Sequence, residues 1–128
     1  APNVLIGFAT LFSQQDTEID EGVYIGPQCN IGKCAIGKNT LLGSGVHIMS
    51  GKGQHNFSDP EKPIKDQGGV FTKVIIGENC WLGNGALIMA NVGKGSIVAA
   101  GSVVVDDVPA GVVVGGNPAK VLRALDSK

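Results

Sequence analysis

The sequence is poor in aromatic residues, which make up 5% of its 128 residues, and it contains 20 glycines. Such a composition would indicate disorder if it had no pattern. Hydrophobic residues nevertheless make up 43% of the chain, and they recur at a strict spacing. We therefore expect a folded chain, and its length is that of one domain with a core of its own.

An excess of charge of either sign is also absent, since ten Lys and Arg face eleven Asp and Glu. Without a basic surplus to neutralise a phosphate backbone, nucleic acid is not an expected partner. No apolar run approaches the roughly 20 residues that cross a bilayer, and the start APNVLIGFATLF lacks the basic region of a signal peptide. We expect a soluble, cytoplasmic protein with no membrane span. The missing initiator Met suggests that the chain is processed or cut from a longer one.

Cysteines are few and odd in number, namely Cys29, Cys34 and Cys80. They show no paired CxxC spacing, which argues against both a disulfide framework and a zinc site. We predict three small, buried, free thiols.

The dominant feature is a six-residue repeat in which a bulky aliphatic residue, usually followed by Gly, has a small residue four positions later. The aliphatic positions are Ile25, Ile31, Ile36, Leu42, Ile48, Ile76, Leu82, Ile88, Val92, Val98 and Val104. The small positions are Cys29, Ala35, Thr40, Val46, Cys80, Ala86, Ser96 and Ser102. A period of six fits neither a helix nor simple strand alternation. It predicts an all-β fold, a triangular parallel β-helix with three short strands and three turns in each coil of about 18 residues.

The repeat divides the chain, which we interpret as a single domain over residues 1–128. Residues 1–18 are a cap or a truncated first coil, and residues 19–108 form the coils. A long loop at about 49–73 interrupts them and carries His55. Residues 109–128 form a C-terminal extension, in which the apolar spacing of AKVLRALDSK predicts a short helix.

Four features in this order carry a resemblance to a known family: the hexapeptide ladder, GQHNFSDP (53–60), IIGENCWLGNGALI (75–88) and the ending AAGSVV…DVP…GNPAKVLR. Over residues 19–125 the chain resembles the hexapeptide-repeat acyltransferases. It looks most like the sugar O-acetyltransferases of polysaccharide and nodulation-factor pathways. The resemblance implies a left-handed β-helix, a homotrimer, and acetyl-CoA as donor, bound between neighbouring subunits.

The same resemblance implies roles for individual residues. In the loop motif, His55 takes the place of the catalytic histidine. An imidazole can take up the proton of a sugar hydroxyl or amine as that group attacks the thioester. We expect direct attack without an acyl-enzyme, because Ser50 and the three cysteines lack an evident base or belong in the core.

Further positions match residues that contact the two substrates in similar enzymes. Those matching coenzyme A contacts are Asn84, Ala100, Lys120 and Arg123. Those expected near the acceptor are Asn56 and Trp81. His47 is not a family match, but from its place after Val46 we expect it to point outward from a turn toward the loop and to line the acceptor pocket. The plainer interpretations are a solvated surface position for His47, support of the loop for Trp81, and a solvated helix face for the two cations. One departure from the family pattern is Asp106 and Asp107, where many relatives have a Thr-Lys or similar pair, and it weakens any phosphate contact there.

Three alternatives stay open at this point. A metal-dependent hydratase of the gamma-class carbonic anhydrase type shares the fold but needs three histidines, and only His47 and His55 exist, so no metal is expected. A non-catalytic β-helix binding module would keep the scaffold and lose the chemistry. Among acetyltransferases, a serine or nucleotide-sugar N-acetyltransferase fits the same repeat.

Overall fold

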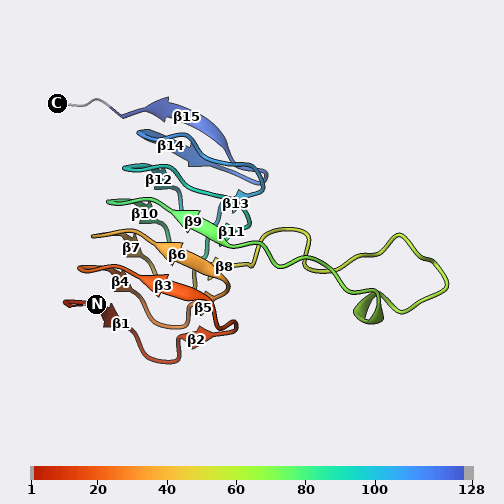
Figure 1. Ribbon diagram of the computed structural model, residues 1–128. Coiled ribbons are helices and arrows are strands. Elements are labelled where there is room, and N and C mark those ends of the chain that lie inside the picture. Colours follow the sequence, from red (N-terminus) through yellow and green to blue (C-terminus); the bar gives the residue numbers. More distant parts are fainter. Residues whose placement is uncertain (1, 126–128) are drawn as a thin grey trace.

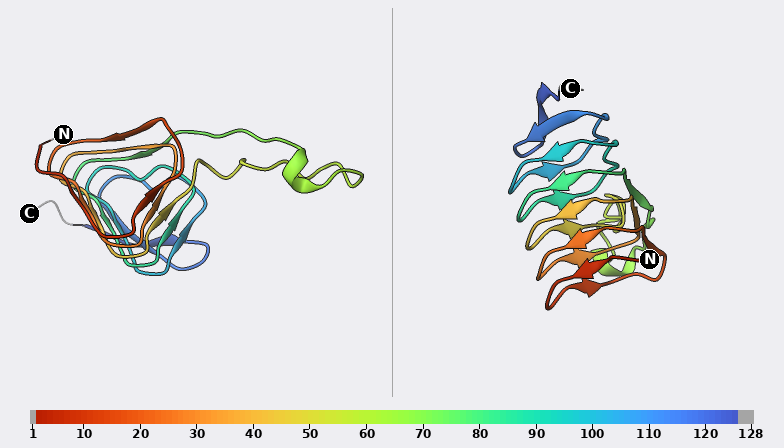
Figure 2. Two further views of the ribbon diagram at one scale, coloured as in Figure 1. Left: turned by 90° about the horizontal axis from the view of Figure 1, so that it is seen from below. Right: turned by 90° about the vertical axis from the view of Figure 1, so that its left-hand side faces the viewer.

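A computed structural model describes residues 2–125, and it shows a left-handed parallel β-helix whose three sheets form the faces of a triangular prism (Figures 1 and 2). Sheet A contains β1 (Leu5–Ile6), β4 (Tyr24–Ile25), β7 (Leu41–Leu42), β10 (Trp81–Leu82), β12 (Ile97–Val98), β14 (Val112–Gly115) and β15 (Lys120–Ala124). Sheet B contains β2 (Leu11–Phe12), β5 (Asn30–Ile31), β8 (His47–Ile48), β11 (Leu87–Ile88) and β13 (Val103–Val104). Sheet C contains β3 (Thr17–Ile19), β6 (Cys34–Ile36) and β9 (Val74–Ile76). The predicted fold class is confirmed.

The hexapeptide ladder is the core of this prism. In each two-residue strand of the middle coils the second residue points inward, so Leu42 and Leu82 stack above one another fully buried while Leu41 and Trp81 point outward. Small polar residues fill the corners, and the backbone satisfies them: the Thr40 hydroxyl donates to the carbonyl of Gly77 at 2.7 Å. The interior is thus narrow, and the buried hydroxyl at this corner has a hydrogen-bond partner.

One shortened repeat shifts the inward pattern. We expected Ala35 in a small inward position, but Cys34 is fully buried and Ala35 is only half-buried. Strand β6 pairs Cys34 with Val74 and Ile36 with Ile76, and side chains alternate along a strand, so the residue between them faces outward. Because this repeat is one residue short, the inward position falls on Cys34 and not on Ala35.

The interruption of the repeat is a long excursion between β8 and β9, and we call residues 49–73 the arm. Figures 1 and 2 show it leaving the prism at the corner between sheets B and C and extending away from it. Its helical content is one 3-10 turn, η1 (Ile64–Asp66). Within residues 2–125, no helix has the length and apolar character that crossing a membrane requires.

The predicted C-terminal helix is wrong. Residues Lys120–Ala124 form β15, which pairs antiparallel with β14 at the last coil. A helix this short is marginal alone, whereas β14 offers a row of backbone groups that would otherwise stay unpaired. Pairing with the sheet edge therefore overrides the apolar spacing, and residues 126–128 of the predicted helix lie outside the described residues.

An ion-paired lysine ties the end of the arm to the prism. The Lys73 ammonium donates to the Asp16 carboxylate at 2.9 Å and also contacts the Glu18 carboxylate. The hydrogen bond from Lys73 lowers the pKa of Asp16 below its ordinary value, and the bond to Glu18 is the main cause that raises the pKa of Lys73. The returning strand of the arm is thus held against the coil that contains β3.

The three thiols are predicted to be inert in the native protein. Burial raises the pKa of Cys34 to about 12 and raises the pKa of Cys29 and Cys80. Because thiolate is the reactive form, a thiol reagent at pH 8 should label the folded chain at least about 100-fold more slowly than the denatured chain. Counting labelled cysteines by mass spectrometry checks this, and rapid labelling of any one thiol in the native state would contradict it.

The Lys73 contact is predicted to appear in the acid titration of Asp16. Because the pKa of Asp16 is lowered by folding, the pair stabilises the fold above the unfolded pKa, and this contribution disappears as pH falls through the folded pKa. In Lys73→Met the pKa of Asp16 should rise toward its ordinary value, as followed by NMR of the carboxyl carbon. Lys38→Met is the control, since Lys38 pairs instead with Glu21 at 3.8 Å. An unchanged Asp16 titration in Lys73→Met would rule out the contact.

Candidate active site

The arm that carries His55 folds back on itself, and backbone hydrogen bonds join its two sides. Its outgoing and returning strands exchange three backbone hydrogen bonds. The N–H groups of Thr72, Val70 and Asn56 donate to the carbonyls of Ser50, Gly53 and Gly68 at 2.9, 2.8 and 2.8 Å respectively. His55 lies directly before the last of these bonds on the outgoing strand, and its side chain is exposed.

The root of the arm is fixed to the prism by a buried serine. The Ser50 hydroxyl, 1% exposed, accepts a hydrogen bond from the N–H of Lys33 at 2.9 Å. The N–H of Ser50 in turn donates to the side-chain oxygen of Gln54 at 2.7 Å. A continuous path of hydrogen bonds therefore leads from the prism to the residue that precedes His55.

Beyond His55 a glutamine organises the outer part of the arm. The Gln67 side-chain amide donates to the carbonyls of Asp59 and Lys62, both at 2.8 Å, and its oxygen accepts from the N–H of Asp59 at 3.1 Å. These bonds close residues 59–67 into a compact tip. The sequence motif predicted the histidine, but these supporting residues have no periodicity that could have revealed them.

A second group of expected residues meets on sheet A, around an apolar cavity of about 450 Å³. The lining residues Trp81, Asn84 and Ala100 come from two successive coils, together with Ile97, Val98 and Ala99. Trp81 is 51% exposed and faces outward from β10. The Asn84 side-chain oxygen accepts from the N–H of Ser44 at 3.0 Å, which fixes its amide at the corner.

The floor of this cavity requires close approach of two coils. A Cβ on Gly83 would lie 2.5 Å from the backbone nitrogen of Ala100 and 2.9 Å from the carbonyl oxygen of Val98. Glycine at this position therefore brings the backbone of Ala100 against the coil below.

The two cations lie farther up the same sheet. Lys120 and Arg123 are exposed on β15, which follows β14 and β12 in sheet A. Register places Arg123 opposite Val113, which in turn lies opposite Ile97 in the cavity wall. The structure thus aligns the cations with the cavity along one face, although on a strand rather than on the expected helix.

His55 and Asn56 do not share this cavity. They lie on the arm, which leaves the prism at the corner between sheets B and C. The cavity residues instead lie on strands of sheet A or directly after them. His47 is exposed on β8 in sheet B, on a strand rather than at the expected turn. Within one chain, the arm residues and the sheet A residues therefore form two separate groups.

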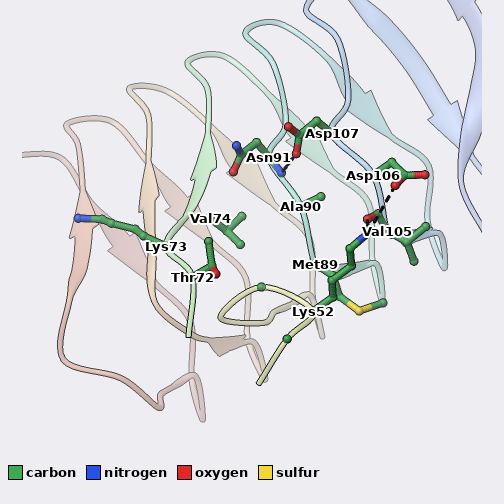
Figure 3. Close-up of a pocket in the computed structure, with 12 residues that line it drawn as sticks. Lys52, Thr72, Lys73, Val74, Met89, Ala90, Asn91, Val105, Asp106 and Asp107 are labelled. Atoms are coloured by element: carbon green, nitrogen blue, oxygen red, sulfur yellow. Dashed lines mark hydrogen bonds and ion pairs between the residues drawn. The ribbon is translucent and has the colours of Figure 1, made fainter. Parts of the chain in front are cut away.

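A further cavity of about 510 Å³ at the arm root was not foreseen (Figure 3). There the Lys52 ammonium donates to the carbonyl of Val105 at 3.0 Å and lies 3.5 Å from the Asp106 carboxylate. Asp107 accepts from the N–H of Asn91 at 2.9 Å. The two aspartates that depart from the family pattern thus have partners within the chain.

The part of the chain that the structure describes contains no candidate metal site. Across residues 2–125 no three His, Cys, Asp or Glu side chains gather in a way that could hold an ion. The arrangement that is present consists of an imidazole on a hydrogen-bonded arm and a separate apolar cavity with cations beside it.

Sequence comparison finds relatives that are acetyltransferases. No protein-family model matches the chain. Serine acetyltransferase 2 of Arabidopsis thaliana is 35% identical over 118 residues, which cover 84% of this chain and 34% of that protein. The 2,3,4,5-tetrahydropyridine-2,6-dicarboxylate N-acetyltransferase of Clostridium perfringens is 56% identical over 59 residues, which cover 44% of this chain and 25% of that protein. The chain thus spans about a quarter to a third of these curated relatives.

Solved structures match over nearly the whole chain. A hexapeptide-repeat-containing acetyltransferase from Vibrio cholerae has a TM-score of 0.73 and 22% identity, covering 96% of this chain and 74% of its own. A galactoside acetyltransferase in complex with coenzyme A has a TM-score of 0.78 and 23% identity, covering 98% and 64% respectively. The expected resemblance is confirmed in the fold: this chain has the left-handed β-helix of the hexapeptide-repeat acetyltransferases.

Proposed function

We propose that this chain transfers an acetyl group from acetyl-CoA to a hydroxyl or amine of a sugar or sugar derivative, with His55 as general base. The observation that carries the proposal is the cavity on sheet A. It gathers Trp81, Asn84 and Ala100, which the family resemblance assigns to the substrates, from coils separated in sequence. The similar fold of a galactoside acetyltransferase that binds coenzyme A supports the same interpretation.

In the proposed reaction the acceptor attacks the thioester directly. The acceptor O–H or N–H bond breaks, and its proton passes to a ring nitrogen of His55 while the acceptor atom bonds to the acetyl carbon. The carbon–sulfur bond then breaks, and the sulfur leaves with the proton that His55 returns. Burial of Ser50 and of the three cysteines argues against an acyl-enzyme, because none of these nucleophiles can reach a bound substrate.

The donor site that we propose follows the face of sheet A. The apolar walls around Trp81 and Ala100 suit a pantetheine arm, and the Asn84 amide offers a polar contact. Lys120 and Arg123, exposed above this cavity, would meet the phosphates as charged donors. The carboxylates of Asp106 and Asp107 do not fit a phosphate and are excluded from this site.

The acceptor site is proposed to include Asn56, Trp81 and His47. The relatives named above act as a serine acetyltransferase and as an N-acetyltransferase of a cyclic dicarboxylate, so the acceptor class needs a direct test. Consumption of acetyl-CoA should be compared for sugars, nucleotide sugars, serine and that dicarboxylate. Turnover is expected with a sugar acceptor, and turnover confined to serine or the dicarboxylate would refute the sugar assignment.

We further propose a homotrimer whose active sites lie between subunits. Support comes from the separation of the arm from the cavity in one chain and from two exposed apolar surfaces. The outward row of sheet A is apolar through six coils: Leu5, Tyr24, Leu41, Trp81, Ile97 and Val113. The arm exposes Phe57, Ile64 and Val70. An arm that packs on sheet A of the next copy would cover both surfaces in a closed ring.

Replacing the proposed base should greatly lower turnover and leave donor binding unchanged. In His55→Ala, kcat should fall by about 10²–10⁴-fold, the range for loss of a general base, while the Kd for acetyl-CoA stays the same. Steady-state kinetics and calorimetry measure the two quantities. Ser58→Ala, an exposed neighbour on the arm, is the matched control and should keep wild-type kcat. Wild-type turnover in His55→Ala would remove the assignment.

Replacing a cation on β15 should weaken the binding only of ligands that carry phosphates. Arg123→Ala should raise the Kd for coenzyme A roughly 3- to 10-fold, a modest loss because the side chain is exposed to solvent. Acetyl-pantetheine lacks the phosphates, so its KM should not change in the same variant. An equal loss of affinity for coenzyme A and for acetyl-pantetheine would mean that Arg123 supports the fold and does not contact the phosphates.

A further inference from the structure

We infer that Gly69 is a positioning residue of the proposed reaction: its missing side chain lets the returning strand of the arm lie against the peptide that precedes His55. The inference rests on the proposed role of His55. It concerns what fixes the imidazole in space and does not depend on which acceptor is used.

The contact is too close for any side chain at position 69. A Cβ on Gly69 would overlap the carbonyl group of Gln54 and would lie 2.8 Å from the carbonyl oxygen of Gly53. All of these atoms are backbone, so no flexible side chain could move aside. Gly69 does not have the left-handed φ that favours glycine, in contrast to Gly68 with a φ of +75°. Space, and not conformational freedom, therefore requires glycine at position 69.

The contact acts on His55 because of the bonds that flank it. The carbonyl of Gln54 belongs to the peptide that continues into His55. On one side, the N–H of Val70 donates to the carbonyl of Gly53, and on the other the N–H of Asn56 donates to the carbonyl of Gly68, both at 2.8 Å. His55 thus lies between two hydrogen bonds that join the two sides of the arm, and its backbone is held before and after the residue.

The inner end of this segment is anchored to the β-helix. The Gln54 side chain accepts from the N–H of Ser50, and the buried Ser50 hydroxyl accepts from the N–H of Lys33. A shift of the Gln54 peptide would therefore strain its link to the prism or move His55. Since the prism is close-packed, the displacement is expected at His55.

The facing strand supplies a matched control. Gly53 also lacks a left-handed φ, but a Cβ there would lie 3.7 Å from its nearest neighbour, the carbonyl oxygen of Val70, which is ordinary contact. Gly69→Ala and Gly53→Ala thus add the same methyl group to opposite strands of one ribbon. Only the first addition collides with backbone.

The test compares these two variants in the full chain. Gly69→Ala should lower kcat about 10- to 100-fold, because a displacement of about 1 Å at a catalytic group costs this much. Its KM for acetyl-CoA and its melting temperature should match wild type, since the arm lies outside the packed prism. Gly53→Ala should behave as wild type in all three quantities. Equal kcat in Gly69→Ala and wild type would overturn the inference.

Amide hydrogen exchange provides a readout that does not need activity. The amides of Asn56 and Val70 should be protected in wild type and in Gly53→Ala, and should exchange faster in Gly69→Ala. Unchanged exchange in Gly69→Ala would also overturn the inference. If wild type transferred acetyl to no acceptor at all, the proposed function would fail, and the exchange comparison would still decide whether Gly69 sets the position of the Gln54–His55 peptide.

Discussion

The parallel pairing of each coil with the next holds this fold together and fixes where its site can lie. Each strand is only a few residues long, so it is stable only when its inward aliphatic side chain stacks on those above and below. The pairing survives the insertion of the arm: Cys34 pairs with Val74 although residues 49–73 intervene. An excursion can therefore leave the prism only at a corner, where no ladder bond is broken. The corner between sheets B and C determines where His55 emerges.

Hydrogen bonds brace the arm from its root to its tip. Backbone bonds join its two strands, Ser50 anchors its root, and Gln67 closes its tip. A catalytic group gains rate from being held in place, because less order has to be imposed when the substrates meet. The prism determines where the arm begins, and we propose that the arm contacts the face of sheet A in a neighbouring copy.

Sequence reasoning predicted the prism well because a six-residue period reports directly on which side chains point inward. It failed where neighbouring structure overrode local pattern. The segment AKVLRALDSK has helical spacing, but Lys120–Ala124 form a strand that pairs with the open edge of β14. Cys34 replaced Ala35 inside because one repeat is a residue short. The roles of His55, Asn84 and Arg123 came from motif resemblance and stay predictions. The sequence alone could not reveal Gly69, because its importance lies in a contact between the two sides of the arm.

The proposed trimer requires the imidazole of one copy to serve the cavity of the next, and mixing of two subunit variants shows whether it does. His55→Ala lacks the base, and Ala100→Trp should fill the cavity on sheet A, so each variant alone should be inactive. When the two are unfolded together and refolded as a random mixture, about a quarter of the sites in a closed ring combine an intact arm with an intact cavity. The mixture should therefore recover about a quarter of wild-type turnover. A mixture as inactive as its components would contradict this arrangement.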